Sequence, residues 1–392
     1  MQTTRLYYDD CYLHQFQASV VEVADAGRRV YLDRTAFYPT SGGQPFDVGT
    51  LVAANGQRVR VVEVIDGDQE GIAHVLDQPI EANAVSAEID WPRRYDHMQQ
   101  HTGQHLLSAV LLELFQVPTV SFHMGAEMST IEIAAAGFSP AQTEQVEQRC
   151  AELVAAARPV AISYESASQD LGLRKPSQRT GVLRLISMDG IDRSACGGTH
   201  VKSTAEIGAI QIRKQEKLRG NVRLEFACGG RALRQAKADF ILLQELSRLL
   251  STPAAQTPAL VAANLDRAKM LEKSLQELTV ELAQMQGREL WLAAPVDANG
   301  LKVITQDGII DDVVRARAQA FVAQGQSVFI AITRDPAAIL LAVSRDSGWH
   351  AGDRIKAAAT AVGGRGGGNA ALAQASLPPG VDPQVFAREL MA

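Results

Sequence analysis

Two short stretches, far apart in the sequence, carry paired side chains that can bind a metal ion. The first is His101-Thr-Gly-Gln-His105 and the second is Cys196-Gly-Gly-Thr-His200. On a helix, the spacing of the first pair places both imidazoles on one face, about one turn apart. In the second, the adjacent glycines let the backbone fold tightly enough for both ends to reach one ion. Three imidazoles and one thiolate match Zn²⁺ in ligand type and number, so the sequence predicts a zinc site.

The ligand count leaves the role of the ion open between a structural and a catalytic site. Four protein ligands are typical of structural zinc, whereas catalytic zinc usually keeps an open position. Catalysis at a four-ligand site therefore requires a fifth position, or the replacement of one ligand by water or substrate. His97 continues the row of histidines at the same spacing. Because four ligands already satisfy zinc, we expect His97 to lie beside the ligands or near the substrate.

The residue after the first histidine argues against a metalloprotease. The His-Glu-x-x-His motif of those enzymes places a general-base glutamate there, and this sequence has Thr102 instead. Threonine has no useful basicity, so peptide hydrolysis by that mechanism is disfavoured. An ester needs much less assistance, and a polarising zinc with a positioned water would suffice.

A Gly-rich loop is a further candidate for contact with a substrate. Residues 37–45 read Phe-Tyr-Pro-Thr-Ser-Gly-Gly-Gln-Pro, in which two glycines allow close approach and neighbouring side chains offer uncharged polar groups. A simple surface turn is the alternative. The loop has neither the lysine of a Walker motif nor a Rossmann spacing, so ATP binding is not expected. The residues singled out are Thr40, Gly42, Gly43 and Gln44.

The composition is that of an ordinary globular protein, with 392 residues and a net charge of −6. The negative balance argues against general polyanion binding, although local basic patches decide contacts with nucleic acid. Four scattered cysteines form no disulfide framework. No apolar run approaches the length of a membrane span, and the N-terminus lacks an apolar signal core. We therefore expect a cytoplasmic protein.

The periodicity of apolar residues and the positions of turn residues predict a multidomain α+β protein with four parts. Residues 1–90 carry short β-branched runs separated by turns, which predict a small β-barrel containing the Gly-rich loop. Residues 91–230, beginning with a helix over about 94–115, predict a zinc-binding α/β sandwich. Residues 231–294 have the pattern of a helical hairpin or short coiled coil, serving as a spacer or a dimer contact. Residues 295–392 alternate strands and helices as a small α/β domain.

Two further features are candidates for contact with a nucleic-acid backbone. Basic patches occur at residues 174–184 and 213–223, although a solvated basic face explains either patch equally well. The run 363–369 reads Gly-Gly-Arg-Gly-Gly-Gly-Asn, whose consecutive N–H groups can hold a phosphate, with a flexible loop as the alternative. The residues concerned are Arg219, Arg223, Gly364, Arg365, Gly366 and Gly367.

Together these stretches resemble the alanyl-tRNA editing family, which comprises the editing domain of alanyl-tRNA synthetase and its free-standing relatives. The resemblance is carried by residues 37–44, by His101-Thr-Gly-Gln-His105-Leu-Leu and by Cys196-Gly-Gly-Thr-His200. The Gly-rich tail is similar to that of the DHH-associated domain of alanyl-tRNA synthetases. The resemblance does not include the aminoacylation domain that precedes these regions in the synthetase, and we expect that domain to be absent. The chain thus looks like the long free-standing form, which edits but does not charge tRNA.

The resemblance implies a zinc-dependent hydrolase that deacylates tRNA(Ala) mischarged with serine, with glycine as a second candidate. A pocket built for alanine rejects an added hydroxyl only weakly, about a hundredfold in comparable cases, so a second hydrolytic site must raise fidelity. The zinc ligands implied are His101, His105, Cys196 and His200. We hypothesise that the Gly42-Gly43 loop approaches the 3′-terminal adenosine, and that Thr40 or His123 recognises the serine hydroxyl.

Two other classes of function are left open by the sequence. One is a non-catalytic tRNA-binding module with a closed structural zinc. The other is a zinc hydrolase of small esters or amides. The free polar groups of the family motifs argue against the first, and the Gly-rich tail and basic patches argue against the second.

Overall fold

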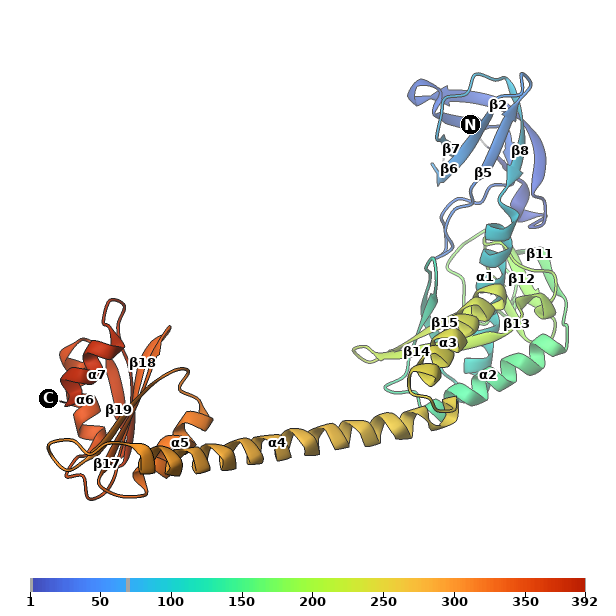
Figure 1. Cartoon of the computed structure of the whole chain (residues 1–392). Coiled ribbons are helices and arrows are strands. Elements are labelled where there is room, and N and C mark those ends of the chain that lie inside the picture. The colour runs from blue at the N-terminus through green and yellow to red at the C-terminus, as the bar shows by residue number, and fades with distance from the viewer. Residues whose placement is uncertain (1–2, 68–70, 392) are drawn as a thin grey trace. The chain divides into compact units, whose positions relative to one another are not determined.

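The computed structural model describes residues 3–67 and 71–391, and the chain divides between Leu246 and Ser247 into two compact units (Figure 1). The first unit contains a closed β-barrel and a body of helices and sheets. The second contains a long helix and a five-stranded sheet. A mixed α/β multidomain protein with a small barrel is therefore confirmed. Within the described residues, no helix combines the length and the apolar character needed to cross a membrane.

The barrel closes in the strand order β2-β3-β7-β6-β5-β8. Side chains on its strands alternate between core and solvent, so that Val59 and Val61 of one strand are buried while the neighbouring Arg58 and Arg60 are exposed. An Asn55-Gly56 turn joins β5 to β6, with Gly56 at a φ of 85°. The barrel strands are β2 (Gln15–Ala24), β3 (Arg29–Leu32), β5 (Gly49–Ala53), β6 (Arg58–Asp66), β7 (Ile72–Leu76) and β8 (Ala84–Ile89). Two short strands, β1 (Thr4–Arg5) and β4 (Arg34–Thr35), pair in parallel beside it.

Helix α1 (Trp91–Phe115) follows the barrel and carries the first pair of predicted metal ligands. The side chain of Asp90 accepts a hydrogen bond from the Arg93 N–H, and Pro92 occupies the first turn. These two start signals explain why the helix begins at Trp91 rather than near residue 94. Leu107 and Val110 lie on its apolar stripe and are fully buried in the core of this unit.

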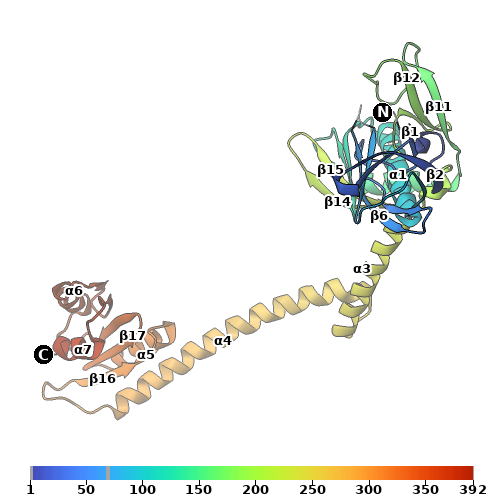
Figure 2. The same ribbon diagram turned by 90° about the horizontal axis from the view of Figure 1, so that it is seen from above.

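Two antiparallel sheets pack against α1, which lies between them in both views (Figures 1 and 2). The larger sheet has the order β14-β15-β10-β9 and the smaller has the order β11-β12-β13. A Cβ on Gly103 would lie 2.3 Å from the Cys228 Sγ, so only glycine lets α1 approach β15 this closely. The remaining elements are β9 (Thr119–Met124), β10 (Ser129–Ile133), α2 (Pro140–Ala155), β11 (Val160–Ser166), β12 (Val182–Met188), β13 (Asp192–Ala195), β14 (Ile210–Lys217) and β15 (Val222–Cys228).

The second unit is built on a sheet with the order β16-β17-β18-β20-β19, in which only β16 and β17 are parallel among the described pairs. The two helices predicted for residues 231–294 are present as α3 (Gly229–Leu249), which spans the boundary between the units, and α4 (Thr257–Ala293). The other elements are β16 (Lys302–Asp307), α5 (Asp312–Val322), β17 (Ser327–Arg334), β18 (Ala337–Val343), α6 (Ala351–Ala361), β19 (Arg365–Gly368), β20 (Leu372–Ser376) and α7 (Pro383–Met391).

The Gly-rich run of this unit forms an edge strand rather than a loop. Residues 365–368 pair with β20 and lie against α6. A Cβ on Gly366 would come within 2.8 Å of the Ile355 side chain and 2.7 Å of Ala375. The glycines therefore allow a helix and a strand to pack closely, a use that the sequence pattern did not reveal.

Candidate metal centre

The structure brings the four predicted ligands together beside the barrel. His101 and His105 lie one turn apart on α1, while Cys196 and His200 lie on the loop after β13, here called the ligand loop (residues 196–200). The four ligand atoms lie within 4.8 Å of one another. The Cys196 Sγ is 3.4 Å from the Nε2 of His101 and 3.4 Å from the Nε2 of His200. One ion placed among these atoms would have three nitrogens and one sulfur around it.

The ligand loop approaches α1 so closely that its glycine is required. A Cβ on Gly198 would lie 2.1 Å from the His101 Cε1, which excludes any other residue there without movement of the loop. The guanidinium of Arg184 holds the loop from behind, donating to the carbonyls of Cys196 at 2.7 Å and Gly198 at 3.0 Å. Arg184 is buried, so this member of a predicted basic patch supports the site rather than facing solvent.

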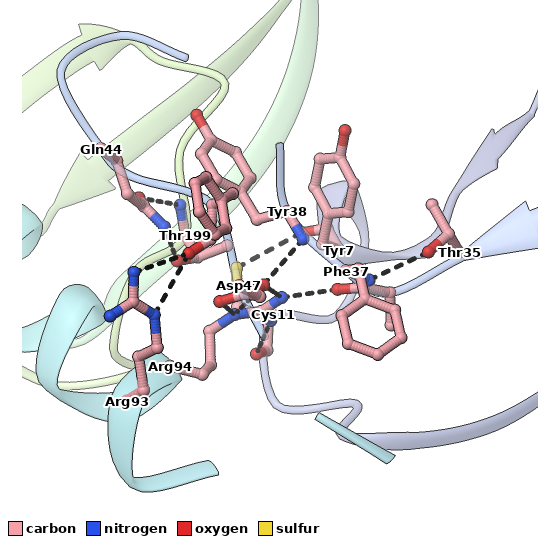
Figure 3. A network of polar contacts seen from close by, with 12 residues as sticks. Tyr7, Cys11, Thr35, Phe37, Tyr38, Gln44, Asp47, Arg93, Arg94 and Thr199 are labelled. Carbon is pink, nitrogen blue, oxygen red and sulfur yellow. Dashed lines mark hydrogen bonds and ion pairs between the residues drawn. The ribbon is translucent and has the colours of Figure 1, made fainter. Parts of the chain in front are cut away.

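The Gly-rich loop of the barrel orients His101. The Gln44 Oε1 accepts hydrogen bonds from the His101 Nδ1 at 2.8 Å and from the Thr199 N–H at 3.1 Å. The amide Nε2 of Gln44 donates to the Thr199 hydroxyl at 2.8 Å (Figure 3). Because the Thr199 N–H can only donate, the atom beside His101 is the amide oxygen, and His101 carries its proton on Nδ1.

A carboxylate orients His105 in the same way. The Asp192 Oδ2 lies 3.1 Å from the His105 Nδ1, and its Oδ1 accepts from the Arg174 Nε at 2.7 Å. Although burial opposes ionisation, His105 and Arg174 hold the pKa of the Asp192 carboxyl below its ordinary value. An ionised carboxylate only accepts, so His105 also carries its proton on Nδ1.

A hydroxyl orients His200. Thr102 donates its proton to the Met98 carbonyl at 2.7 Å, so its oxygen is left to accept from the His200 Nδ1 at 3.2 Å and from the Val201 N–H at 3.2 Å. Thr102, which occupies the position of the protease glutamate, thus orients His200 through a hydrogen bond. All three imidazoles are therefore held through Nδ1, which leaves Nε2 as the nitrogen available to a metal ion.

The electrostatics of the four ligands also suit a cation. Burial raises the pKa of the Cys196 thiol, but His101 and His200 outweigh it and hold that pKa well below its usual value. Burial lowers the pKa of His200 to about 3, which keeps its imidazole neutral. Burial likewise opposes protonation of His105, yet Asp192 and Cys196 raise its pKa to about 9. A thiolate and a carboxylate here stabilise positive charge, and a bound Zn²⁺ would supply it while fitting this donor set.

A cavity of about 630 Å³ opens onto the site, and His101, His105 and Cys196 form part of its wall. Phe122 of β9 lines it too, with its ring centroid 5.4 Å from that of His101. Gln104 contributes to the wall while donating its amide N–H to the Ser108 hydroxyl at 2.8 Å. The four-ligand site is therefore reachable from one side by a small ligand.

The loop that carries Gln44 is anchored to α1 by a buried ion pair. Asp47 and Arg94 are both fully buried and pair directly (Figure 3). The Asp47 Oδ2 also accepts from the Tyr38 N–H at 2.7 Å, and the Arg94 Nη1 donates to the Cys11 carbonyl at 3.0 Å. The barrel and the helix that bears two ligands are thereby held in one arrangement.

The other predicted site residues of the Gly-rich loop and its surroundings fall in different places. Gly42 lines the cavity, and Gly43 packs so closely on β9 that a Cβ would lie 2.8 Å from the Phe122 carbonyl oxygen. Thr40 is exposed and accepts from the Phe46 N–H at 3.2 Å. His123 is exposed, since it alternates with Phe122 along β9. Among the described residues that line the cavity, neither Thr40 nor His123 appears.

His97 lies outside the group of four and is buried. Burial lowers the pKa of its imidazole to about 4, and within residues 3–67 and 71–391 its Nδ1 has no hydrogen-bond partner. Of the predicted RNA contacts, Arg219 is exposed near the tip of the β14–β15 hairpin, and Arg223 pairs with Glu132 at 2.7 Å. The predicted glycines and Arg365 of β19 belong to the second unit.

Sequence reasoning did not identify three of the residues that surround the ligands. Thr102 and Gln104 stand inside the first ligand motif, where the fourfold spacing drew attention only to its ends. Asp192 precedes Cys196 by four residues, but nothing in the sequence around a single aspartate in a strand indicates that it orients a metal ligand. Its partner His105 is 87 positions away, a contact that only the fold creates.

The chain is similar in sequence to tRNA synthetases and to parts of them. Residues 183–225 match the family described as "Threonyl and Alanyl tRNA synthetase second additional domain", and residues 3–93 match "tRNA synthetases class II (A)". The chain is 29% identical to the alanine–tRNA ligase of Pyrococcus furiosus over 96% of its own length, but covers 42% of that protein. A solved C-Ala domain of Aquifex aeolicus alanyl-tRNA synthetase matches 25% of the chain and 93% of that domain, at 20% identity and a TM-score of 0.21.

The free-standing relatives match over more of their own length. The alanyl-tRNA editing protein AlaX-M of Methanosarcina acetivorans is 36% identical, with 57% of this chain covering 98% of it. The alanyl-tRNA editing protein AlaX-L of Pyrococcus horikoshii is 32% identical over 94% of this chain and 93% of its own. At this identity and coverage, the chain belongs to the alanyl-tRNA editing protein family.

Proposed function

We propose that this protein hydrolyses the ester bond of tRNA(Ala) mischarged with serine, and also with glycine, at a zinc ion held by His101, His105, Cys196 and His200. The observation that carries the proposal is the set of three imidazoles, each held by a hydrogen bond at Nδ1, around a thiolate and open to a cavity. Membership of the editing family supplies the substrate class. Because its substrate is a charged tRNA, we place the protein in the cytoplasm.

A bound Zn²⁺ would supply a Lewis acid that polarises the ester or activates a water molecule. The protein's own residues set the geometry around it. Gln44, Asp192 and Thr102 hold the three imidazoles through Nδ1, so that Nε2 is the nitrogen left for the metal. The wall formed by Gly42 and Phe122 bounds the space in which the aminoacyl group of the terminal adenosine would lie.

Recognition of the serine hydroxyl is assigned to Gln104, in preference to Thr40 and His123. Gln104 lines the cavity between the two ligands of α1. Its amide N–H is engaged by the Ser108 hydroxyl, which leaves its carbonyl oxygen to accept from a substrate hydroxyl. Glycine lacks that hydroxyl, so Gln104→Leu should reduce hydrolysis of the serine ester more than that of the glycine ester. A comparison with Thr40→Val decides between the two residues.

The central experiment compares hydrolysis of tRNA(Ala) carrying serine, glycine or alanine by the zinc-loaded protein. The expected result is rapid loss of the serine ester, loss of the glycine ester, and survival of the alanine ester. Equal rates of hydrolysis for all three esters would contradict the proposed editing function.

The four-ligand count favours one alternative, a non-catalytic tRNA-binding module with structural zinc. In that case no ester would be lost faster than in buffer, with or without chelator.

A further inference from the structure

A basic segment that lines the cavity is bonded to Asp192, the residue that orients His105. Residues 174–179, here called the strap, belong to the connection between β11 and β12. Leu171, just before the strap, is buried against Leu183 and Leu185. The Arg193 side chain donates to the Leu171 carbonyl at 2.9 Å. This small core gives the start of the strap a defined position on the body of the first unit.

Arg174 ties the strap to the metal centre. Its backbone N–H donates to the Arg193 carbonyl at 2.9 Å, and its side chain donates to the Asp192 carboxylate at 2.7 Å. The other oxygen of Asp192 holds His105. The charge of Arg174 is therefore used within the protein, and the residues that follow it are held at the rim of the cavity.

Lys175 and Arg179 supply positive charge that the protein itself does not neutralise. Both line the cavity and both are exposed. Among residues 3–67 and 71–391, no carboxylate forms an ion pair with either side chain. By contrast, the guanidinium of Arg5, which also lines the cavity, is bonded to Asp66 at 2.7 and 2.9 Å. The strap thus gives one rim of the cavity a net positive charge.

We propose that Lys175 and Arg179 form a phosphate subsite, which binds phosphodiester groups of the single-stranded 3′ end of the tRNA. This deepens the proposed function and rests on it. An ester located at the metal centre leaves the adjoining nucleotides to follow the cavity outward, and cationic side chains position such strands through their phosphates. The two cations carry no sequence information, so their contribution is to the affinity for the strand and its dependence on salt.

The test uses the full-length zinc-loaded protein with Lys175→Ala/Arg179→Ala. The matched control is Arg28→Ala/Arg58→Ala, which removes the same charge from exposed barrel residues outside the cavity. For seryl-tRNA(Ala), the strap variant should raise KM about tenfold and leave kcat unchanged. The slope of log KM against log salt should fall by about 1.4, from two contacts worth about 0.7 each. Hydrolysis of 3′-O-seryl-adenosine, which has no phosphodiester, should be unchanged, and so should every constant of the control.

Three results would overturn the subsite: an unchanged KM and salt slope, an equal effect in the control pair, or an equal loss with seryl-adenosine. If the wild-type protein hydrolyses neither ester, the proposed function fails independently of the strap. Binding of a short single-stranded RNA with the tRNA 3′ sequence, measured by fluorescence anisotropy, then decides the subsite by itself. Weaker binding by the strap variant than by wild type and control supports it, and equal binding refutes it.

Discussion

Each histidine of the metal centre is oriented by a different chemical group. Gln44 uses an amide oxygen, Asp192 a carboxylate and Thr102 a hydroxyl, and each accepts from an Nδ1–H. These three groups come from the barrel loop, from β13 and from α1 itself. The orientations of the three rings are thereby set by the folded protein, which lowers the reorganisation needed when a metal ion binds.

Asp192→Asn should weaken zinc binding by about 10- to 100-fold, because the amide lacks the charge that strengthens His105 as a ligand. The measurement is competition for zinc with a chromophoric chelator, together with the absorption spectrum of the Co²⁺ form. Asp189→Asn is the matched control, since Asp189 lies three residues away and is largely exposed. An affinity within twofold of wild type would show that Asp192 does not support His105.

The types and spacing of the four candidate ligands predicted that they converge, but the sequence did not predict the residues that orient them. Two pairs of metal-binding side chains, each four positions apart, led to the prediction that His101 and Cys196 share one site. Gln44 was expected to contact substrate, yet it is buried and bonded to a residue 57 positions away. A polar residue in a Gly-rich loop suits either use, and only tertiary packing decides between them.

At the scale of elements, α1 is held to the barrel by a fully buried ion pair. Each charge stabilises the other in the interior, because an unpaired buried charge costs far more free energy than an unpaired exposed one. Asp47 and Arg94 also satisfy backbone groups of the barrel loop and the N-terminal segment. The ion pair therefore ties α1, which carries two ligands, to the barrel loop that carries Gln44.

Asp47→Ala should lower the free energy of unfolding by about 3–5 kcal/mol, because it strands the Arg94 charge in the interior. Chemical denaturation followed by circular dichroism measures the change. Arg34→Ala breaks an ion pair with Asp33 that is partly exposed, and should cost less than about 1 kcal/mol. Similar losses in the two variants would contradict the structural role of the buried pair.

The barrel contains a histidine that makes its stability depend on pH. His74 is fully buried, with Thr35 at 2.8 Å from its Nε2, and burial lowers its pKa from 6.5 to about 4. The unfolded chain binds the proton first as pH falls. The stabilising contribution is therefore complete above pH 6.5 and declines by about 3 kcal/mol as the pH approaches 4.

Hydrogen exchange of the barrel amides measures this dependence. The stability difference between wild type and His74→Gln should shrink as the pH falls from 7 to 4. His14→Gln, at an exposed position, should leave the pH dependence unaltered. A constant difference between wild type and His74→Gln would show that His74 does not titrate as expected.

The local sequence pattern predicted which segments form helices and strands, but it did not predict which strands pair with one another. Alternating residues predicted the barrel strands and an apolar stripe predicted α1, since both patterns reflect which side chains face a core. The pairing of β10 with β15, however, joins strands separated by α2 and the smaller sheet. The Gly-rich run predicts a loop or a phosphate site, because the sequence carries no local pattern for the close packing of a helix on a strand.

At the scale of the whole molecule, the chain separates into a unit with the metal centre and a second unit with α4 and its sheet. The AlaX-M relative is covered almost completely by 57% of this chain, so the family includes members without a counterpart to the rest. We therefore propose that the first unit carries out the chemistry and that the second adds affinity for tRNA. The exposed apolar row on α4, which includes Leu271, Leu275 and Leu278, is the candidate dimer contact.

Deletion of residues 247–392 should leave zinc content and seryl-adenosine hydrolysis intact while raising the KM for seryl-tRNA(Ala) about tenfold. The physical reason is that the tRNA body loses its contacts, while the cavity and its four ligands keep all of theirs. Parallel kinetics with the small ester and the tRNA check this. An unchanged KM for tRNA would leave the second unit as a dimer contact alone.

Zinc content and seryl-tRNA(Ala) hydrolysis, measured on the same preparations of wild type and Cys196→Ala, test the central claim most directly. Wild type should contain one zinc per chain and deacylate the substrate, losing the activity on chelation and regaining it with Zn²⁺. Cys196→Ala should lose most of both zinc and activity, because one of the four donors is removed. If Cys196→Ala keeps wild-type zinc content and wild-type hydrolysis, the assignment of this site is wrong.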